Sequence, residues 1–146
     1  MLLFEKTRAI VAELSLEFPN WRTPAMDGRL FDLITEIGER LDHHWSVAEM
    51  AAKTELSLSQ FRSIFKKVVL ITPAAYLKET RLLKAKHLLE TTYEHIDQIG
   101  IQVGMQDHSH FTRDFKDRFG ITPTGHRRKF QAKRQDEILS GQKPAI

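Results

Sequence analysis

Residues 72–90 read TPAAYLKETRLLKAKHLLE, and they predict the helix around which the rest of the chain is organised. Thr72 is a typical N-cap, Pro73 suits the first helical position, and Ala, Leu, Lys and Glu fill the interior. A helix of this length extends about 27 Å, given the rise of ~1.5 Å per residue. We therefore expect one long, rigid element in the middle of the chain.

Similar stretches lie on both sides of this helix. Residues 65–73 read FKKVVLITP and residues 115–123 read FKDRFGITP, so five of the nine positions are identical. Upstream apolar residues repeat with nearly the same spacing, and Phe61 corresponds to Phe111. Short helix pairs joined by a tight turn are typical of helix-turn-helix units. The repeat predicts two such units, with helices at about 47–53 and 57–69, and at about 96–103 and 107–119.

Capping and turn residues support each unit. Ser46 precedes the first short helix, and Glu49 is placed to complete a capping box with it. Ser57 and Asp107 are the expected N-caps of the two second helices. Gly104 can adopt the positive φ that a turn between helices requires. These signals predict an all-α, homeodomain-like fold in which a long linker helix joins two helix-turn-helix subdomains.

The chain divides into five expected segments. An upstream helix, with Leu30, Ile34, Ile37 and Leu41 on one stripe, is expected at about 27–42 and belongs to the first unit. The segments are 1–26, an N-terminal helix that is a remnant of an upstream domain or a dimerisation element; 27–71, the first helix-turn-helix subdomain; 72–91, the linker helix; 92–130, the second subdomain; and 131–146, a polar, disordered tail that follows a short closing helix.

Composition narrows the class of protein. The 146 residues include 41% hydrophobic residues but only five Pro and seven Gly, which favours a folded chain. The absence of cysteine excludes disulfides, thiolate zinc sites and cysteine nucleophiles, and is compatible with a cytoplasmic location. No apolar run predicts a membrane span. Residues 1–45 carry a net charge of −3, whereas residues 46–130 carry +5, so positive charge gathers on the repeats, as nucleic-acid binding requires.

The chain resembles the DNA-binding domain of AraC/XylS-type transcription regulators over about residues 30–130. The resemblance is strongest over residues 96–128, IDQIGIQVGMQDHSHFTRDFKDRFGITPTGHRR. It implies that two recognition helices enter successive major grooves on one face of duplex DNA. The chain departs from the family pattern at four positions: two usual glycines are Glu55 and Leu70, a usual tyrosine is His126, and a usual aromatic residue is Met105.

Carried over by position, the resemblance assigns base contacts to outward side chains of both second helices. These candidates are Ser59, Gln60, Arg62 and Ser63 in the first copy, and His108, Ser109, Thr112 and Arg113 in the second. Basic side chains beyond them are candidates for phosphate contacts, which add affinity without sequence preference: Lys66, Lys67, Lys116, Arg127 and Arg128.

Each of these side chains also has a simpler interpretation. Arg62 and Arg113 either read guanine through O6 and N7 or contact phosphate, and Gln60 either reads adenine or is solvated. The basic run at 127–129 is otherwise a solvated surface. The histidines offer too few ligands at helical spacing for a metal site, and no catalytic or cofactor site is expected.

The sequence therefore predicts a transcription regulator that binds an asymmetric duplex operator and is not an enzyme. The alternative is a protein-interaction module with little DNA affinity, in which the apolar helix at residues 3–18 forms a homodimer or docks on an N-terminal sensor domain or RNA polymerase.

Overall fold

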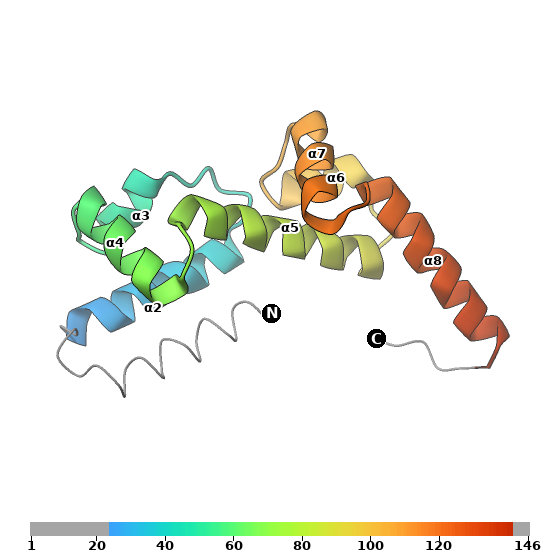
Figure 1. Cartoon of the computed structure of the whole chain (residues 1–146), viewed down its shortest axis with the longest axis horizontal. Helices are drawn as coiled ribbons and strands as arrows, with labels where there is room; N and C mark the ends of the chain where they lie inside the picture. The colour runs from blue at the N-terminus through green and yellow to red at the C-terminus, as the bar shows by residue number, and fades with distance from the viewer. Residues whose placement is uncertain (1–23, 142–146) are drawn as a thin grey trace. The chain divides into compact units, whose positions relative to one another are not determined.

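The computed structural model describes residues 24–141, which form seven α-helices and no strand (Figure 1). The helix predicted within residues 1–26 falls almost entirely outside this range. The described helices are α2 (Pro24–Glu39), α3 (Val47–Lys53), α4 (Leu58–Val69), α5 (Pro73–Thr91), α6 (Ile96–Gln102), α7 (His108–Phe119) and α8 (Pro123–Leu139). The predicted all-α class is confirmed, and the repeat helices agree with their predicted bounds to within one or two residues.

Backbone contacts group the chain into two compact units that divide between Thr80 and Arg81, within α5. The first unit contains α2, α3, α4 and the beginning of α5. The second contains the rest of α5 with α6, α7 and α8. Thr72 caps α5 as predicted, because its hydroxyl accepts a hydrogen bond from the Ala75 backbone N–H at 3.2 Å. Each unit has its own hydrophobic core and is described separately below.

Aromatic side chains of α4 occupy the centre of the first core. The Phe61 and Phe65 ring centroids lie 5.5 Å apart, and Phe65 meets Tyr76 of α5 edge-on at 5.6 Å. Each fully buried aromatic side chain of this kind contributes about 1.5–3 kcal/mol. The predicted stripe of α2 packs against them, and the other members of this core include Leu30, Leu33, Ile34, Ile37, Leu41, Trp45, Met50, Ala51 and Val68. Burial on one side of α4 therefore determines which of its side chains face outward.

The second core repeats this arrangement. Phe111 and Phe115 of α7 lie 6.0 Å apart and pack on α5 and α6 through Leu82, Ala85, Leu89, Ile99 and Val103. Gly100 allows the turn to approach α6, because a Cβ atom at this position would lie 2.8 Å from the Met105 carbonyl oxygen. The Met105 N–H also donates to the Gly100 carbonyl at 2.7 Å. Met105, in place of the aromatic residue usual in the family, is partly buried against this core.

The closing helix is longer than the sequence predicted. Residues 131–139 were expected in a disordered tail, but the structure places them in α8, which continues to Leu139. The residues from Gln131 to Leu139 include no Gly or Pro, and most are strong helix formers, so nothing in this stretch stops a helix begun at Thr122-Pro123. The helix ends at Ser140-Gly141, where Gly141 adopts a φ of +73°. Residues 142–146 lie outside the described range.

Candidate nucleic-acid interface

The outward face of α4 is polar because its inward face is committed to the core. Phe61, Phe65 and Val68 are buried at helical spacing. Positions on the opposite side carry Ser59, Arg62, Ser63 and Lys66, and the structure leaves all four exposed, as predicted. Lys67 is exposed as well. The N-terminal half of α4 therefore presents hydrogen-bonding groups, and its C-terminal half presents positive charge.

The structure assigns Gln60 a capping role that the sequence analysis did not predict. The Ser57 hydroxyl accepts from the Gln60 N–H at 3.2 Å, and the Gln60 side-chain oxygen accepts from the Ser57 N–H at 3.4 Å. This reciprocal pair is a complete capping box. Adenine readout by glutamine uses both the oxygen and the nitrogen of the amide. With the oxygen turned back to the helix start, the Gln60 amide nitrogen remains as a donor.

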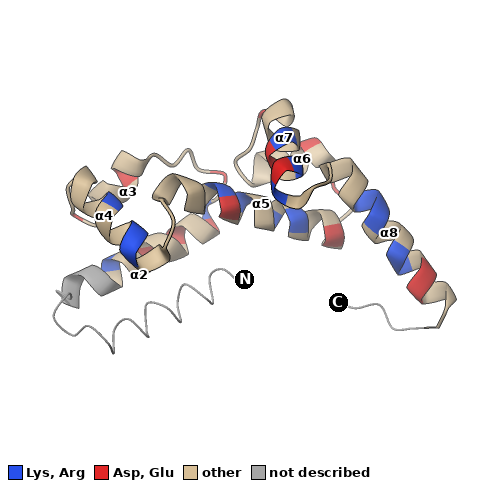
Figure 2. Ribbon diagram, viewed as in Figure 1, with Lys and Arg blue, Asp and Glu red and all other residues tan. Residues whose placement is uncertain are grey.

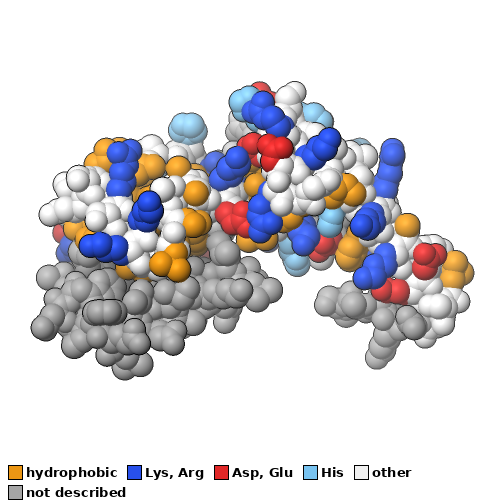
Figure 3. All heavy atoms as spheres, viewed as in Figure 1, with side chains coloured by type: hydrophobic (Ala, Val, Ile, Leu, Met, Phe, Trp, Pro, Cys, Tyr) orange, Lys and Arg blue, Asp and Glu red, His pale blue; other side chains and the backbone are white. Residues whose placement is uncertain are grey.

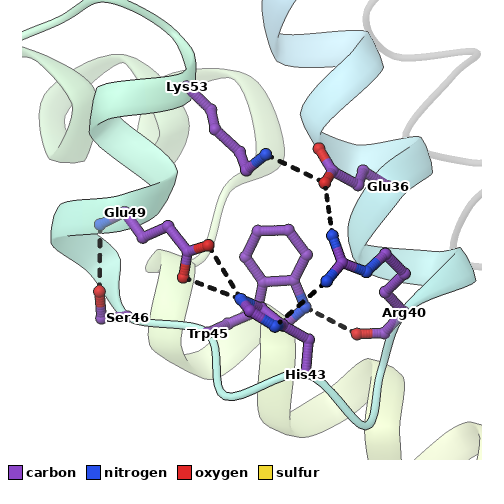
Figure 4. Close-up of polar contacts among 7 residues, drawn as sticks. All are labelled: Glu36, Arg40, His43, Trp45, Ser46, Glu49 and Lys53. Carbon is purple, nitrogen blue, oxygen red and sulfur yellow. Dashed lines mark hydrogen bonds and ion pairs between the residues drawn. The ribbon is translucent and has the colours of Figure 1, made fainter.

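A chain of polar contacts holds α3 against α2 around the Trp45 ring (Figure 4). Glu36 of α2 accepts from Lys53 of α3 at 3.0 Å and from Arg40 at 3.1 Å. The hydrogen bond from Lys53 is the main cause that lowers the pKa of Glu36 below its ordinary value. The Trp45 indole N–H donates to the Arg40 carbonyl at 2.8 Å, which closes α2 onto the loop before α3. These contacts support the platform on which α4 packs.

Half of the capping box predicted at α3 was wrong. The Ser46 hydroxyl does accept from the Glu49 N–H, at 3.1 Å. The Glu49 carboxylate, however, pairs with the His43 imidazole Nε2 at 2.9 and 3.1 Å rather than with the Ser46 backbone N–H. His43 is itself held edge-on to Trp45, with ring centroids 4.7 Å apart. The His43 imidazole therefore takes the carboxylate that the capping box would use. The spacing of Ser46 and Glu49 in the sequence cannot show this competition.

Both departures from the family's glycine positions in the first unit adopt left-handed backbone. Glu55, in the turn between α3 and α4, has a φ of +56°, and Leu70, which ends α4, has a φ of +73°. The corresponding residues of the second unit, Gly104 and Gly120, have φ values of +80° and +77°. The turn geometry is therefore the same in both units. In the first unit, however, it is made by residues with a side chain, which costs roughly 1–2 kcal/mol at each position.

The outward face of α7 has the same plan as that of α4 but different side chains. The Asp107 carboxylate caps the helix by accepting from the His110 N–H at 2.8 Å, and this hydrogen bond is the main cause that lowers the pKa of Asp107. The predicted base-contact residues His108, Ser109 and Arg113 are exposed, and Thr112 is half-buried. Figure 3 shows histidine, basic and acidic side chains together over this part of the surface.

One outward side chain of α7 is held in place by a neighbouring helix. The His108 ring nitrogen Nδ1 lies 2.6 Å from a carboxylate oxygen of Asp97 in α6. This pairing orients the imidazole so that its second nitrogen, Nε2, points away from the acid. Both residues are well exposed, at 60% and 72% of their side chains, so the contact positions the ring more than it adds stability.

The structure separates the predicted phosphate-contact residues into two groups. Lys66, Lys67, Lys116 and Arg128 are exposed, and Lys and Arg recur along α4, α7 and α8 (Figure 2). Arg127 instead donates to backbone carbonyls in the last turn of α5 and just after it: Leu89 at 3.4 Å, Thr92 at 3.2 Å, and Glu94. Carbonyls at a helix C-terminus lack helical partners and attract cations. Within the structure, Arg127 therefore fastens α8 to the end of α5.

His126, in place of the usual tyrosine, strengthens the same junction. Its Nε2 atom lies 2.8 Å from the Glu90 carboxylate of α5, and its ring meets Phe115 at 5.8 Å. The departure from the family pattern thus retains an aromatic ring against Phe115 and adds a polar contact to α5.

Polar-residue reasoning missed one exposed side chain near the start of α4, Leu58. The repeat contained the signal, because Leu58 stands fifty residues before His108, just as Phe61 stands before Phe111.

No cluster of His, Cys, Asp or Glu able to hold a metal ion occurs in the described range 24–141. The two exposed, hydrogen-bonding and cationic helix faces define the class: a helix-turn-helix protein built to contact duplex nucleic acid.

Comparison with known proteins shows the family. A family model described as a helix-turn-helix domain matches residues 50–129. The transcriptional regulator AlkR of Acinetobacter baylyi is 31% identical over 129 residues, which are 88% of this chain and 42% of AlkR. An AraC-type regulator structure from Chromobacterium violaceum aligns with a TM-score of 0.65 and 26% identity, over 74% of this chain and 96% of that one.

A third comparison concerns the fold. The DNA-binding domain of AdpA, solved in complex with a target DNA, aligns with a TM-score of 0.71 over 73% of this chain and 96% of that chain, at 24% identity. The chain belongs to the AraC-type helix-turn-helix family of DNA-binding transcription regulators, which is a family of transcription factors and not of enzymes. The chain spans about two fifths of the length of the curated relatives it matches. None of the helices within residues 24–141 is long and apolar enough to cross a membrane.

Proposed function

We propose that this chain binds duplex DNA sequence-specifically by placing α4 and α7 in successive major grooves. One observation carries the proposal: both helices combine a side-chain N-cap, two buried phenylalanines and an exposed face of hydrogen-bonding and cationic residues. Major-groove base edges are read by such side chains from the N-terminal part of a helix. The AdpA DNA-binding domain, which aligns with this chain, was solved in complex with a target DNA, and this supports DNA binding by this chain.

The operator is asymmetric in this proposal. Arg62 and Ser63 of α4 correspond to Thr112 and Arg113 of α7, so the two helices present their arginines at different positions. Two non-identical readers on one chain need no palindromic site. Residues 27–71 and 92–130 act as the reading units, residues 72–91 act as the spacer, and the site covers about two helical turns, roughly 20 base pairs.

Base contacts produce a sequence preference, whereas phosphate contacts produce a salt dependence of the affinity. The experiment measures both. Duplexes are selected from a random pool with the whole chain, and the affinity for the winning site is measured at several salt concentrations. We expect two preferred blocks of sequence about one helical turn apart. Each phosphate contacted adds about −0.9 to the slope of log K against log salt, so the four exposed cationic candidates Lys66, Lys67, Lys116 and Arg128 together predict a slope near −4.

Arg113→Ala and Arg128→Ala form a matched pair. Arg113→Ala is expected to cost ~1–3 kcal/mol and to relax preference at one base pair. Arg128→Ala is expected to weaken all sequences equally and to lower the salt slope by about one. If Arg113→Ala weakens every sequence equally, that arginine contacts phosphate only. A selection that returns one block would show that only one unit reads bases, and no enrichment would refute sequence-specific binding.

Partners beyond DNA remain predictions. A homodimer partner, an N-terminal sensor domain and RNA polymerase were predicted to bind through residues 3–18, which lie outside the described range. Sedimentation of the chain with and without the selected duplex tests the homodimer. A mass that rises with protein concentration, together with weak DNA binding, would favour the protein-interaction module.

A further inference from the structure

Leu58 is an apolar side chain at the reading end of a polar helix. It is the first residue of α4, directly after the N-cap Ser57, and it is 40% exposed. The buried stripe of α4 begins only at Phe61, and Leu58 is absent from the hydrophobic core of its unit. The α4 turn that is placed to enter a groove therefore presents a methyl-bearing side chain beside its polar groups.

Two relations place Leu58 among the base-contact candidates. It lies four residues before Arg62, and side chains at this spacing are neighbours on one helix face. It also corresponds to His108 in the second unit, where the exposed imidazole is oriented by Asp97 at 2.6 Å. The same position thus carries an oriented polar group in one recognition helix and a branched aliphatic group in the other.

We propose that Leu58 contacts the 5-methyl group of a thymine in the major groove and gives the α4 half of the operator a preference for thymine at one position. Among the base edges in the major groove, only thymine presents a methyl group, and apolar side chains recognise it by contact. Because Leu58 neighbours Arg62, the thymine is expected one or two base pairs from the position that Arg62 affects. This inference rests on the proposed function of α4 as a DNA reader.

Deoxyuridine scanning tests the contact at a single methyl group. Each thymine of the selected site is replaced in turn by deoxyuridine, which removes only the methyl, and the change in Kd is measured for the wild-type chain and for Leu58→Ala. For the wild type, we expect a loss of about three- to fivefold at one position in the α4 half, the size expected for burying one methyl group. Leu58→Ala should abolish that loss at that position alone.

Two further variants control the interpretation. Leu58→Met keeps an apolar side chain of similar volume and should retain part of the deoxyuridine effect. Leu139→Ala removes another exposed leucine, 76% accessible at the end of α8, and should leave the whole pattern unchanged. Helical content by circular dichroism should be the same in every variant, because alanine is a good helix former and Leu58 lies outside the core.

The outcomes separate this proposal from the proposed function. If Arg62→Ala alters the selected motif but the deoxyuridine pattern is identical in wild type and Leu58→Ala, α4 reads DNA and the role of Leu58 is refuted. If neither variant changes the motif or the pattern, both the reading role of α4 and the contact of Leu58 are refuted. A deoxyuridine effect in the α4 half that disappears only in Leu58→Ala supports both.

Discussion

Leu70 offers a direct test of how α4 is ended and aimed. Leu70 is the C-cap of α4, with φ at +73° and ψ at −5°, and it is 66% exposed. Leu70→Gly removes the side-chain clash of the left-handed conformation, which is worth roughly 1–2 kcal/mol. Glycine also makes the unfolded chain more flexible, and this lowers the stability gained by about 0.5–1 kcal/mol. Little buried surface is lost, so the net prediction is a gain of about 0.5–1 kcal/mol.

The second unit supplies the reverse experiment at the matching position. Gly120 ends α7 with φ at +77°, and a Cβ added there meets no atom within 4 Å. Gly120→Ala therefore introduces backbone strain without a steric clash, and we expect a loss of about 1 kcal/mol. Leu70→Ala keeps the Cβ atom and should leave stability nearly unchanged.

Urea and thermal unfolding of the three variants measure these effects. For a domain of this size, ~1 kcal/mol corresponds to a shift of about 2–4 °C in Tm. Helix signal should be followed together with tryptophan fluorescence in a Trp21→Phe background, so that the buried Trp45 indole alone reports on the first unit. If Leu70→Gly destabilises while Gly120→Ala also destabilises, Leu70 makes stabilising contacts that outweigh its strain, and the explanation of the turn from φ alone is refuted.

Three further predictions concern the scaffold of the second unit and its neighbours. Gly100→Ala should destabilise the chain by roughly 1–3 kcal/mol, because the new Cβ would lie 2.8 Å from the Met105 carbonyl oxygen. Ala51→Gly, at the corresponding position of the first unit, should cost about 1 kcal/mol or less. Urea midpoints compare the two variants. Arg127→Ala should lower the urea midpoint by leaving three carbonyls of the α5 end without their guanidinium partner, while Arg128→Ala should not. The folded-state pKa of Asp107 lies below its ordinary value of 3.8. The charged cap therefore contributes stability above pH 3.8, and this contribution is lost as the pH falls through the lower folded-state pKa. Asp107→Asn should remove this part of the acid dependence of unfolding, measured from urea midpoints at several pH values.

The helices of both units could be predicted from the sequence because each local signal agreed with the repeat. Ser57, Thr72, Asp107 and Thr122 each cap the helix that follows them. Cap residues act through hydrogen bonds to N–H groups only two or three positions away, so local sequence contains the whole interaction. The inward phenylalanines follow from helical spacing for the same reason.

The functions of individual polar side chains could not be predicted in this way. Gln60 turns back to its own N-cap, Glu49 leaves a cap to pair with His43, and Arg127 reaches carbonyls more than thirty residues earlier. Each of these groups has several partners within reach, and tertiary packing decides which partner is nearest. The same competition explains why a basic residue can be assigned to a DNA backbone from sequence and then be found holding two helices together.

The two units together suggest how one scaffold supports two different readers. Core, caps and turn geometry are shared: Phe61 and Phe65 match Phe111 and Phe115, and left-handed residues end α4 and α7 alike. Because the shared residues face inward or lie at the helix ends, substitutions on the outward faces can accumulate without loss of the fold. Several outward positions differ, with Leu58 corresponding to His108 and the arginines displaced by one position. In the proposed mode of binding, these different outward faces give the chain a direction on DNA, since reversing the site would present each helix with the half suited to the other.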